Sequence, residues 1–293
     1  HPTGGLYFGA PGGELVDGSH HAAKLHDLPH TLLDPDSLRA RFPLFHPALG
    51  TVALHERFAG WLRCEAALIR FATLARAAGA QLREQTRVLQ VERAPNGGVQ
   101  IRLENGERWS ADAVVDTRGP GMQEAHPAWK LRVTRQVLGW FLPSAPAELA
   151  AAALPCWAAE AGAASEEGGG LFYATPARGG LIKAARHLPG AEITPYCVEA
   201  AQPEELNDVQ RALRRLLPAA AGKLERVAAC QYTMSSDGHF RLGSHPSGAR
   251  GAALAGLSGH GFKFAPALGR ALVEIALDGG TVLPVGFLAP PAD

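Results

Sequence analysis

The clearest helical pattern in the chain lies in residues 64–78. Leu68, Phe71 and Ala75 recur at intervals of three and four, the spacing that places apolar side chains on one face of a helix. Gly79 follows directly, and glycine is the residue that most often ends a helix. These features predict an amphipathic helix that ends near Gly79.

End signals indicate three further helices. Asp34 can cap a helix over 35–42, which has proline at its first position. A helix near 203–216 has two acidic residues in its first turn, and a helix over 262–278 ends at Gly279.

Asn-Gly pairs predict hairpins in the middle of the chain. One pair, at 96–97, separates the strands 86–92 and 98–103, and a second, at 105–106, leads into a strand over 109–116. Asn-Gly between alternating apolar and polar segments is the strongest short-range hairpin signal.

The remaining strands are short, and a small-residue strand, a glycine-rich loop and a helix follow one another over 251–278. We expect 143–169 to be mostly loop and 234–248 to be a loop. Mixed strands and helices of this kind predict an α/β or α+β protein. The other predicted strands are 5–9, 51–55, 133–141, 170–174, 180–185, 225–232 and 251–256.

Composition narrows the class of protein. The 293 residues are 46% hydrophobic and 19% charged, which fits about two globular domains of roughly 150 residues each. Lys+Arg and Asp+Glu are both 28, so no field of one sign favours nucleic acid or an anionic membrane. The most apolar stretch, 147–164, carries two glutamates and is too polar to span a bilayer. With no basic-then-apolar leader at its start, the chain is expected to be a soluble cytoplasmic protein.

The cysteines give no sign of a scaffold or a zinc centre. They are far apart and form no CxxC pair, which argues against both a disulfide framework and a zinc site. The four are Cys64, Cys156, Cys197 and Cys230.

Four histidines near the start of the chain form a candidate metal site. Of His20, His21, His26 and His30, only the last two have helical i,i+4 spacing, and Pro29 between them argues against one continuous helix face. No metal is expected.

The segment 256–264 (GLSGHGFKF) carries the sharpest chemical signal. Its three glycines allow the backbone to approach a flat or anionic group, and the helix that follows aims its N–H groups at the loop. Lys263 lies in the first helical turn, where the helix dipole disfavours a cation. A lysine at this unfavourable position suggests a functional role. The alternative is a tight strand-to-helix turn with a solvated lysine, and the residues alone leave both interpretations open.

Four other residues draw attention, although each is more often packing or surface than catalysis. Cys230 ends a predicted strand, where a cysteine is usually a small buried hydrophobe. Lys183 follows a hydrophobic pair and is expected to be partly buried, with a pKa that shifts easily. Tyr173 precedes it and His187 follows it.

Taken together, these segments resemble the flavin-dependent N-methyl amino acid oxidases, the family of monomeric sarcosine oxidase and N-methyltryptophan oxidase within the D-amino acid oxidase superfamily. The resemblance covers nearly the whole chain, and its specific part is GHGFK with an upstream cysteine. It is carried by Gly256–Phe264, by Cys230-Gln231-Tyr232-Thr233, by Tyr173, Pro176, Lys183 and His187, by Thr134-Arg135-Gln136-Val137, by Leu33-Asp34 and Arg41-Phe42-Pro43, and by Thr3-Gly4-Gly5-Leu6.

The resemblance implies FAD as the cofactor, attached through a cysteinyl thioether at Cys230. Lys263 matches the lysine that promotes the reaction of reduced flavin with oxygen, where a cation would stabilise a developing superoxide charge. The positions that match cofactor contacts are Gly256, Ser258, Gly259, His260, Gly261, Phe262, Lys263 and Val88.

It also implies a substrate pocket that holds the amino acid against the flavin. The positions that match this pocket are Tyr173, Lys183, His187 and Tyr232. The architecture it implies is an FAD-binding Rossmann-like domain, incomplete here, from 51–130 and 225–293, interleaved with a mixed-sheet substrate domain from 1–50 and 131–224.

Two departures from the family pattern stand out. The chain has no GxGxxG for the ADP half of FAD, nor a counterpart of the family's arginine above the flavin. Thr117-Arg118-Gly119-Pro120 stands where the family shows a small turn by the cofactor, so Arg118 and Pro120 would crowd a backbone approach.

The expected function is oxidation of a secondary N-methyl amino acid to an imine, with oxygen reduced to hydrogen peroxide. The spacing from Pro176 to Lys183 looks closer to the N-methyltryptophan branch than to the sarcosine branch. The expected partners are a small amino acid and oxygen, and the expected state is a monomer or weak oligomer. The alternatives are an inactive N-terminally truncated fragment, a related glycine or D-amino acid oxidase, and a non-catalytic scaffold.

Overall fold

A computed structural model describes residues 1–164, 169–187 and 190–290 of the chain. The chain divides into two compact units. Unit 1 contains residues 1–62, 136–190 and 199–230, and unit 2 contains residues 63–135, 191–198 and 231–293. The predicted assignment of one domain to the cofactor and the other to the substrate stays a prediction.

Unit 1 is built on a mixed sheet whose strand order is β12-β8-β11-β10-β9-β1-β3-β2. Strand β1 pairs in parallel with β9 and antiparallel with β3. The strands are β1 (Gly5–Gly9), β2 (His30–Leu33), β3 (Val52–Glu56), β8 (Arg132–Phe141), β9 (Cys156–Glu160), β10 (Leu171–Arg178), β11 (Leu181–His187) and β12 (Leu224–Met234), and the ends of β8 and β12 extend into unit 2.

One face of this sheet is buried against helices. Phe8, Phe141 and Phe172 from the strands form one apolar core with Leu38 of α2 and Leu213 of α7. Because side chains alternate along a strand, residues next to these in sequence project from the opposite face. The helices of unit 1 are α1 (Glu14–Leu25), α2 (Pro35–Arg41), α5 (Pro146–Ala152), α6 (Ala161–Ala164) and α7 (Asn207–Leu216).

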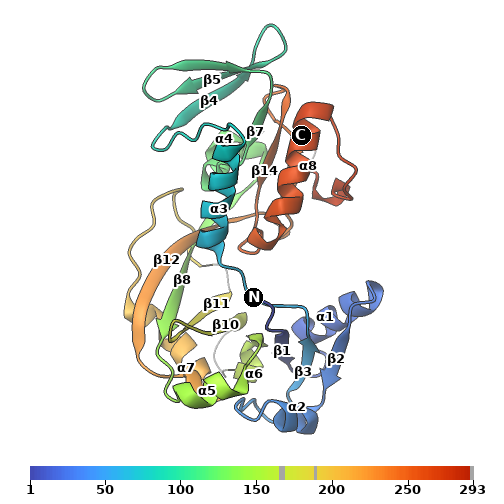
Figure 1. Ribbon diagram of the computed structural model, residues 1–293, viewed down its shortest axis with the longest axis vertical. Coiled ribbons are helices and arrows are strands. Elements are labelled where there is room, and N and C mark those ends of the chain that lie inside the picture. The colour runs from blue at the N-terminus through green and yellow to red at the C-terminus, as the bar shows by residue number, and fades with distance from the viewer. Residues whose placement is uncertain (165–168, 188–189, 291–293) are drawn as a thin grey trace. The chain divides into compact units, whose positions relative to one another are not determined.

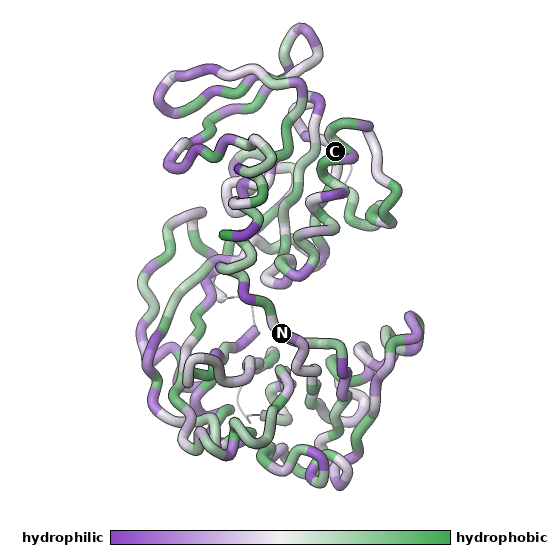
Figure 2. Tube along the Cα trace, viewed as in Figure 1, coloured by the Kyte–Doolittle hydropathy of each residue, from purple (hydrophilic) through white to green (hydrophobic). Residues whose placement is uncertain are grey.

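Unit 2 contains two three-stranded sheets. In the order β13-β14-β7, strand β14 lies between an antiparallel and a parallel neighbour, and α8 packs along it (Figure 1). Strand β14 is hydrophobic along its length (Figure 2). The second sheet has the order β4-β5-β6. The elements are β4 (Val88–Arg93), β5 (Val99–Leu103), β6 (Arg108–Ala111), β7 (Val114–Asp116), β13 (Arg241–Ser244), β14 (Gly251–Ala255), α3 (Cys64–Ala77), α4 (Met122–Ala125) and α8 (Ala265–Asp278).

The structure confirms the mixed class and most of the predicted elements. The Asp34 carboxylate accepts a hydrogen bond from the Ser37 backbone N–H at 2.7 Å, so it caps α2 as predicted. Both predicted Asn-Gly hairpins are present, and α8 ends at Gly279 with φ of +79°.

Three predictions about loops and strands were wrong. The expected loop 143–169 contains α5, β9 and α6, and the expected loop 234–248 contains β13. The single strand expected over 109–116 is two strands, β6 and β7, which belong to different sheets. Helix α1 and strand β2 were not predicted. Among the described residues, no helix has both the length and the apolar character needed to cross a bilayer.

Candidate active site

The loop 256–261 joins β14 to α8 in unit 2 and has an unusual backbone. Gly256, Ser258 and Gly259 all have positive φ, of +64°, +47° and +79°. Ser258 tolerates this conformation because its buried hydroxyl donates to the Gly256 carbonyl at 3.1 Å, while its N–H donates to the Thr233 carbonyl at 2.9 Å. The loop is therefore fixed against the end of β12.

The glycines of this loop make room for the chain's own side chains. A Cβ at Gly259 would lie 2.3 Å from Cε2 of Tyr232, and a Cβ at Gly261 would lie 2.7 Å from the Leu257 Cβ. Tyr232 therefore packs directly on the loop, and its assignment to the substrate pocket stays a prediction. Close packing inside the protein already accounts for these two glycines, whatever the loop binds.

Lys263 follows the loop in a short 3₁₀ turn, Phe262–Phe264. Its side chain reaches the surface, with Nζ 5.3 Å from the centre of the Phe264 ring. Partial burial lowers the pKa of its ammonium group below the usual value. A cavity of about 450 Å³ is lined by Lys263 itself, by His239 and His260, and otherwise by apolar residues such as Phe264 and Phe287.

In unit 1, three of the predicted pocket residues share one face of the sheet. Phe172 and Ala174 of β10, and Ile182 and Ala184 of β11, are in the core. The residues between and beside them therefore project from the opposite face. The residues that do so are Tyr173, Lys183 and His187.

The structure places Cys230 and Lys183 in the same sheet, two strands apart. Cys230 is half-buried on β12, and Lys183 is on β11, with β8 between the two strands. Burial raises the pKa of the Cys230 thiol, and the positive charge of Lys183 partly opposes that increase. A thiol attaches to a cofactor as the thiolate, the form that a positive charge favours.

Other predicted residues are distributed between the units. Val88 begins β4, in the β4-β5-β6 sheet of unit 2, and is 38% exposed. Tyr232 and the residues 256–264 also belong to unit 2, whereas Cys230 belongs to unit 1.

The turn 117–120, which departs from the family pattern, is held by its own contacts. Arg118 binds the buried carboxylate of Asp116, and the Tyr196 hydroxyl donates to the Arg118 carbonyl at 2.9 Å. The same hydroxyl accepts from the Gly121 N–H at 3.2 Å.

Sequence reasoning did not find the cluster around Asp116. His126 and His245 also lie against this carboxylate, which is 5% exposed. The three residues are far apart in the chain, so no spacing motif could have joined them. The only hint in the sequence was an acid at the end of an apolar strand.

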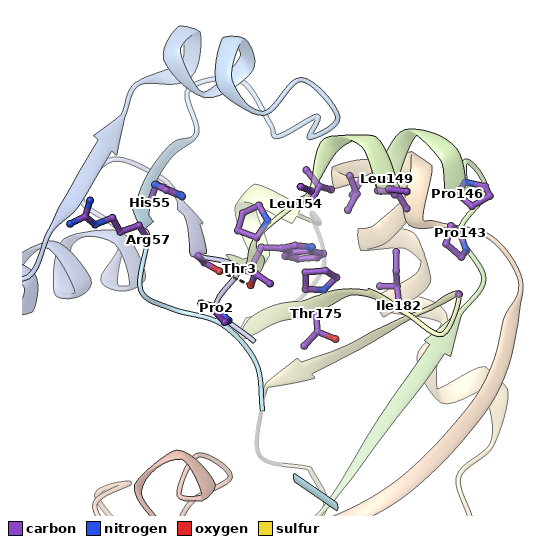
Figure 3. A pocket seen from close by; sticks show the side chains of 18 residues that line it. Pro2, Thr3, His55, Arg57, Pro143, Pro146, Leu149, Leu154, Thr175 and Ile182 are labelled. Atoms are coloured by element: carbon purple, nitrogen blue, oxygen red, sulfur yellow. Dashed lines mark hydrogen bonds between the residues drawn. The ribbon is translucent and has the colours of Figure 1, made fainter. Parts of the chain in front are cut away.

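A cavity of about 730 Å³ in unit 1 is lined in part by Ile182, which precedes Lys183, and by Thr175, which pairs with Lys183. Figure 3 shows His55 at one end and Pro143 and Pro146 at the other. None of the residues assigned to cofactor or substrate by resemblance lines it.

Known proteins with similar sequences match most of the chain. It is 32% identical to a monomeric sarcosine oxidase of Bacillus sp. (strain B-0618), over 95% of this chain and 72% of the relative. It is 29% identical to an N-methyl-L-tryptophan oxidase of Yersinia pestis (strain Pestoides F), over 94% of this chain and 72% of the relative.

Solved structures share the fold. The L-proline dehydrogenase from P. horikoshii superimposes with a TM-score of 0.78 and 22% identity, covering 99% of this chain and 76% of that one. At this level of identity the likeness shows the fold alone.

Fold and sequence together define a flavin-dependent oxidoreductase. The family described as FAD dependent oxidoreductase matches residues 1–275, and the chain belongs to it. The expected resemblance, the oxidoreductase class and the use of FAD by the family are thereby confirmed.

Proposed function

We propose that the protein oxidises a secondary N-methyl amino acid, of the N-methyl-L-tryptophan or sarcosine type, to the corresponding imine. The substrate loses two electrons and two protons from its C–H and N–H bonds, and oxygen takes up both pairs to give hydrogen peroxide. FAD, when bound, supplies the two-electron chemistry that links these half-reactions. The names of the similar oxidases support the substrate class.

The observation that carries the proposal is the position of a half-buried Cys230 on β12, in the same sheet as Lys183 on β11. We assign Cys230 as the thiol that holds FAD covalently. Thioether formation would join the Cys230 thiolate to a methyl carbon of FAD, with loss of one C–H proton and with two electrons passing through the flavin to oxygen; burial alone would keep this thiol protonated. Lys183 acts on the sulfur by stabilising its negative charge, so a neutral residue at 183 disfavours attachment.

The remaining residues of the same face would orient the substrate. Tyr173 and His187 project from the sheet face that also carries Lys183. In unit 2, Tyr232 is fixed by its packing against Gly259. We assign these three side chains to binding of the amino acid.

We assign Lys263 the promotion of oxygen reduction. Oxygen gains negative charge as it is reduced, and a nearby ammonium group stabilises that charge. The lowered pKa of Lys263 also eases proton donation from its Nζ to the forming peroxide.

Absorbance of the purified chain, before and after acid precipitation, tests the cofactor assignment. Flavin absorbance that stays with the precipitate supports attachment at Cys230. Cys230→Ser should release it, while Cys197→Ser, at an exposed cysteine, should not. Free FAD in the supernatant of the unmodified protein would contradict a covalent link.

Peroxide release with N-methyl-L-tryptophan, sarcosine and glycine tests the reaction. The proposal expects activity with one of the two N-methyl amino acids and little with glycine. A chain loaded with FAD that releases no peroxide with either N-methyl amino acid would contradict it and support the fragment or scaffold alternative.

Reoxidation of the reduced protein by oxygen tests the roles of the lysines. Lys263→Met should slow reoxidation while substrate still reduces the cofactor, and Lys24→Met, on the exposed end of α1, serves as the control. Slow reoxidation in Lys183→Met together with normal reoxidation in Lys263→Met would move the oxygen role to Lys183.

A further inference from the structure

Three side chains with metal-ligating atoms meet inside unit 2. Asp116 ends β7, His126 follows α4, and His245 follows β13. One ligand atom from each lies within 4.8 Å of the other two. Asp116 Oδ2 is 3.4 Å from His245 Nε2 and 3.7 Å from His126 Nε2.

One of these ligand atoms, His126 Nε2, lacks a hydrogen-bond partner. His126 is nine-tenths buried, and within the described part of the chain its Nε2 has no hydrogen-bond partner. Its distance of 3.7 Å from Asp116 is too long for a hydrogen bond. A buried nitrogen without a hydrogen-bond partner is destabilising, so the structure leaves a place for a group that this nitrogen can bind.

Ser247 orients the ring of the second histidine, His245. His245 Nδ1 lies 2.8 Å from the Ser247 hydroxyl. The Ser247 backbone N–H also donates to Nδ1, at 3.3 Å, so two contacts hold the ring with Nε2 toward Asp116. Such a partner on the far ring nitrogen is the usual support of a metal-bound histidine.

A guanidinium group already occupies one side of the cluster. Arg118 Nε donates to Asp116 Oδ1 at 2.9 Å, and its terminal nitrogen lies 2.6 Å from Oδ2. Both oxygens of this carboxylate therefore already face a positive group, which is the kind of partner that a metal ion would replace.

We propose that Asp116, His126 and His245 form a binding site for a divalent transition-metal ion such as Zn²⁺, and that Arg118 closes this site when the ion is absent. Zinc binds imidazole nitrogen and carboxylate oxygen tetrahedrally at about 2.0–2.1 Å, which sets neighbouring ligand atoms about 3.4 Å apart. The 3.4 and 3.7 Å separations are close to that value. On binding, the ion takes the place of the Arg118 guanidinium, whose side chain is 24% exposed and can turn to solvent.

The ion would join three separate segments of unit 2. It would tie the end of β7 to the residue after α4 and to the turn between β13 and β14. We infer a structural role, because a bound ion that favours the folded state stabilises it by mass action. This inference is independent of the proposed oxidase activity.

Calorimetric titration of the full chain with Zn²⁺, after treatment with EDTA, tests the site. One ion should bind per chain, with an increase in the unfolding temperature. His126→Phe keeps a ring against Trp129 and should weaken binding at least tenfold. Arg118→Gln removes the competing cation and should strengthen binding by about tenfold.

The surface histidines provide the matched control. His20 and His30 form a partly buried pair with ring nitrogens 3.0 Å apart, and changing both to alanine should leave the affinity unchanged. Co²⁺ should give visible d–d absorption without a thiolate charge-transfer band, which separates this site from the four cysteines. No saturable binding, equal affinity in His126→Phe, or loss of binding in the His20/His30 variant would overturn the proposal.

Discussion

At the scale of single residues, Gly259 is the position in the site that is least able to accept a side chain. Its φ is +79°, and an added Cβ would lie 2.3 Å from the Tyr232 ring. Gly259→Ala should therefore lower the free energy of unfolding by about 2 kcal/mol or more. Gly269, inside α8, has open space around it, so Gly269→Ala should raise the same quantity by about 0.5–1 kcal/mol. Urea denaturation measures both, and equal losses would contradict this account of the loop.

The buried carboxylate of Asp116 should give stability a distinctive pH dependence. Its pKa in the folded protein is far below the unfolded value of about 3.9. Its contribution is therefore present above that pH and is lost as the pH falls below it. Asp116→Asn leaves Arg118 without its partner and should cost about 3 kcal/mol at pH 7.

Urea denaturation in the presence of EDTA, at pH 7 and at pH 3, measures this difference without any contribution from a metal. The gap between the original chain and Asp116→Asn should narrow at pH 3. A gap of equal size at both pH values would show that the charge is not what stabilises the cluster.

At the scale of elements, α3 and α8 differ sharply although both are amphipathic. Helix α8 buries Leu268 and Leu272, whereas α3 buries none of its residues and leaves Leu68 and Phe71 57% and 47% exposed. Changing Leu68 and Phe71 together to glutamine should alter the free energy of unfolding by no more than about 0.5 kcal/mol per site. Leu272→Ala should cost about 2–5 kcal/mol. A large loss from the α3 variant would mean that this helix packs more tightly than its exposure indicates.

Elements with local signals were predictable from the sequence, and elements defined by distant partners were not. Helix α2 carries its own cap at Asp34, and the hairpins carry their own turns. Helix α1 buries only Val16 and Ala23, so its apolar stripe is too thin to recognise. Strand β9 lies in an alanine-rich region where no period stands out, and it forms only because β1 and β10 pair with it.

The candidate site likewise contains parts that the sequence predicts and parts that it does not. The loop 256–261 and the alternating residues of β10 and β11 follow from local patterns. Lys183 and Cys230 lie in the same sheet because β8 pairs with both of their strands. This strand order depends on the tertiary fold and not on a local pattern. The cluster of Asp116, His126 and His245 likewise depends on tertiary packing, so no sequence motif predicts it.

At the scale of the whole molecule, the similarity to oxidases extends across both units, but charge decides how the chain behaves in solution. The formal net charge is zero, the 12 histidines are counted as neutral, and the sequence pI is about 7.3. Near that pH, little repulsion keeps copies apart, and the exposed apolar side chains of α3 offer a surface for association. As the pH falls below about 6.5, histidines gain positive charge and repulsion increases.

Self-association should therefore be strongest near pH 7.3 and weaker at pH 5.5. Sedimentation velocity over a range of concentrations measures it directly. The variant with glutamine at both Leu68 and Phe71 should associate less at pH 7.3 while keeping the same net charge, which separates the apolar contribution from the electrostatic one. Stronger association at pH 5.5 would show that charge repulsion does not limit it, and an unchanged variant would place the contact surface away from α3.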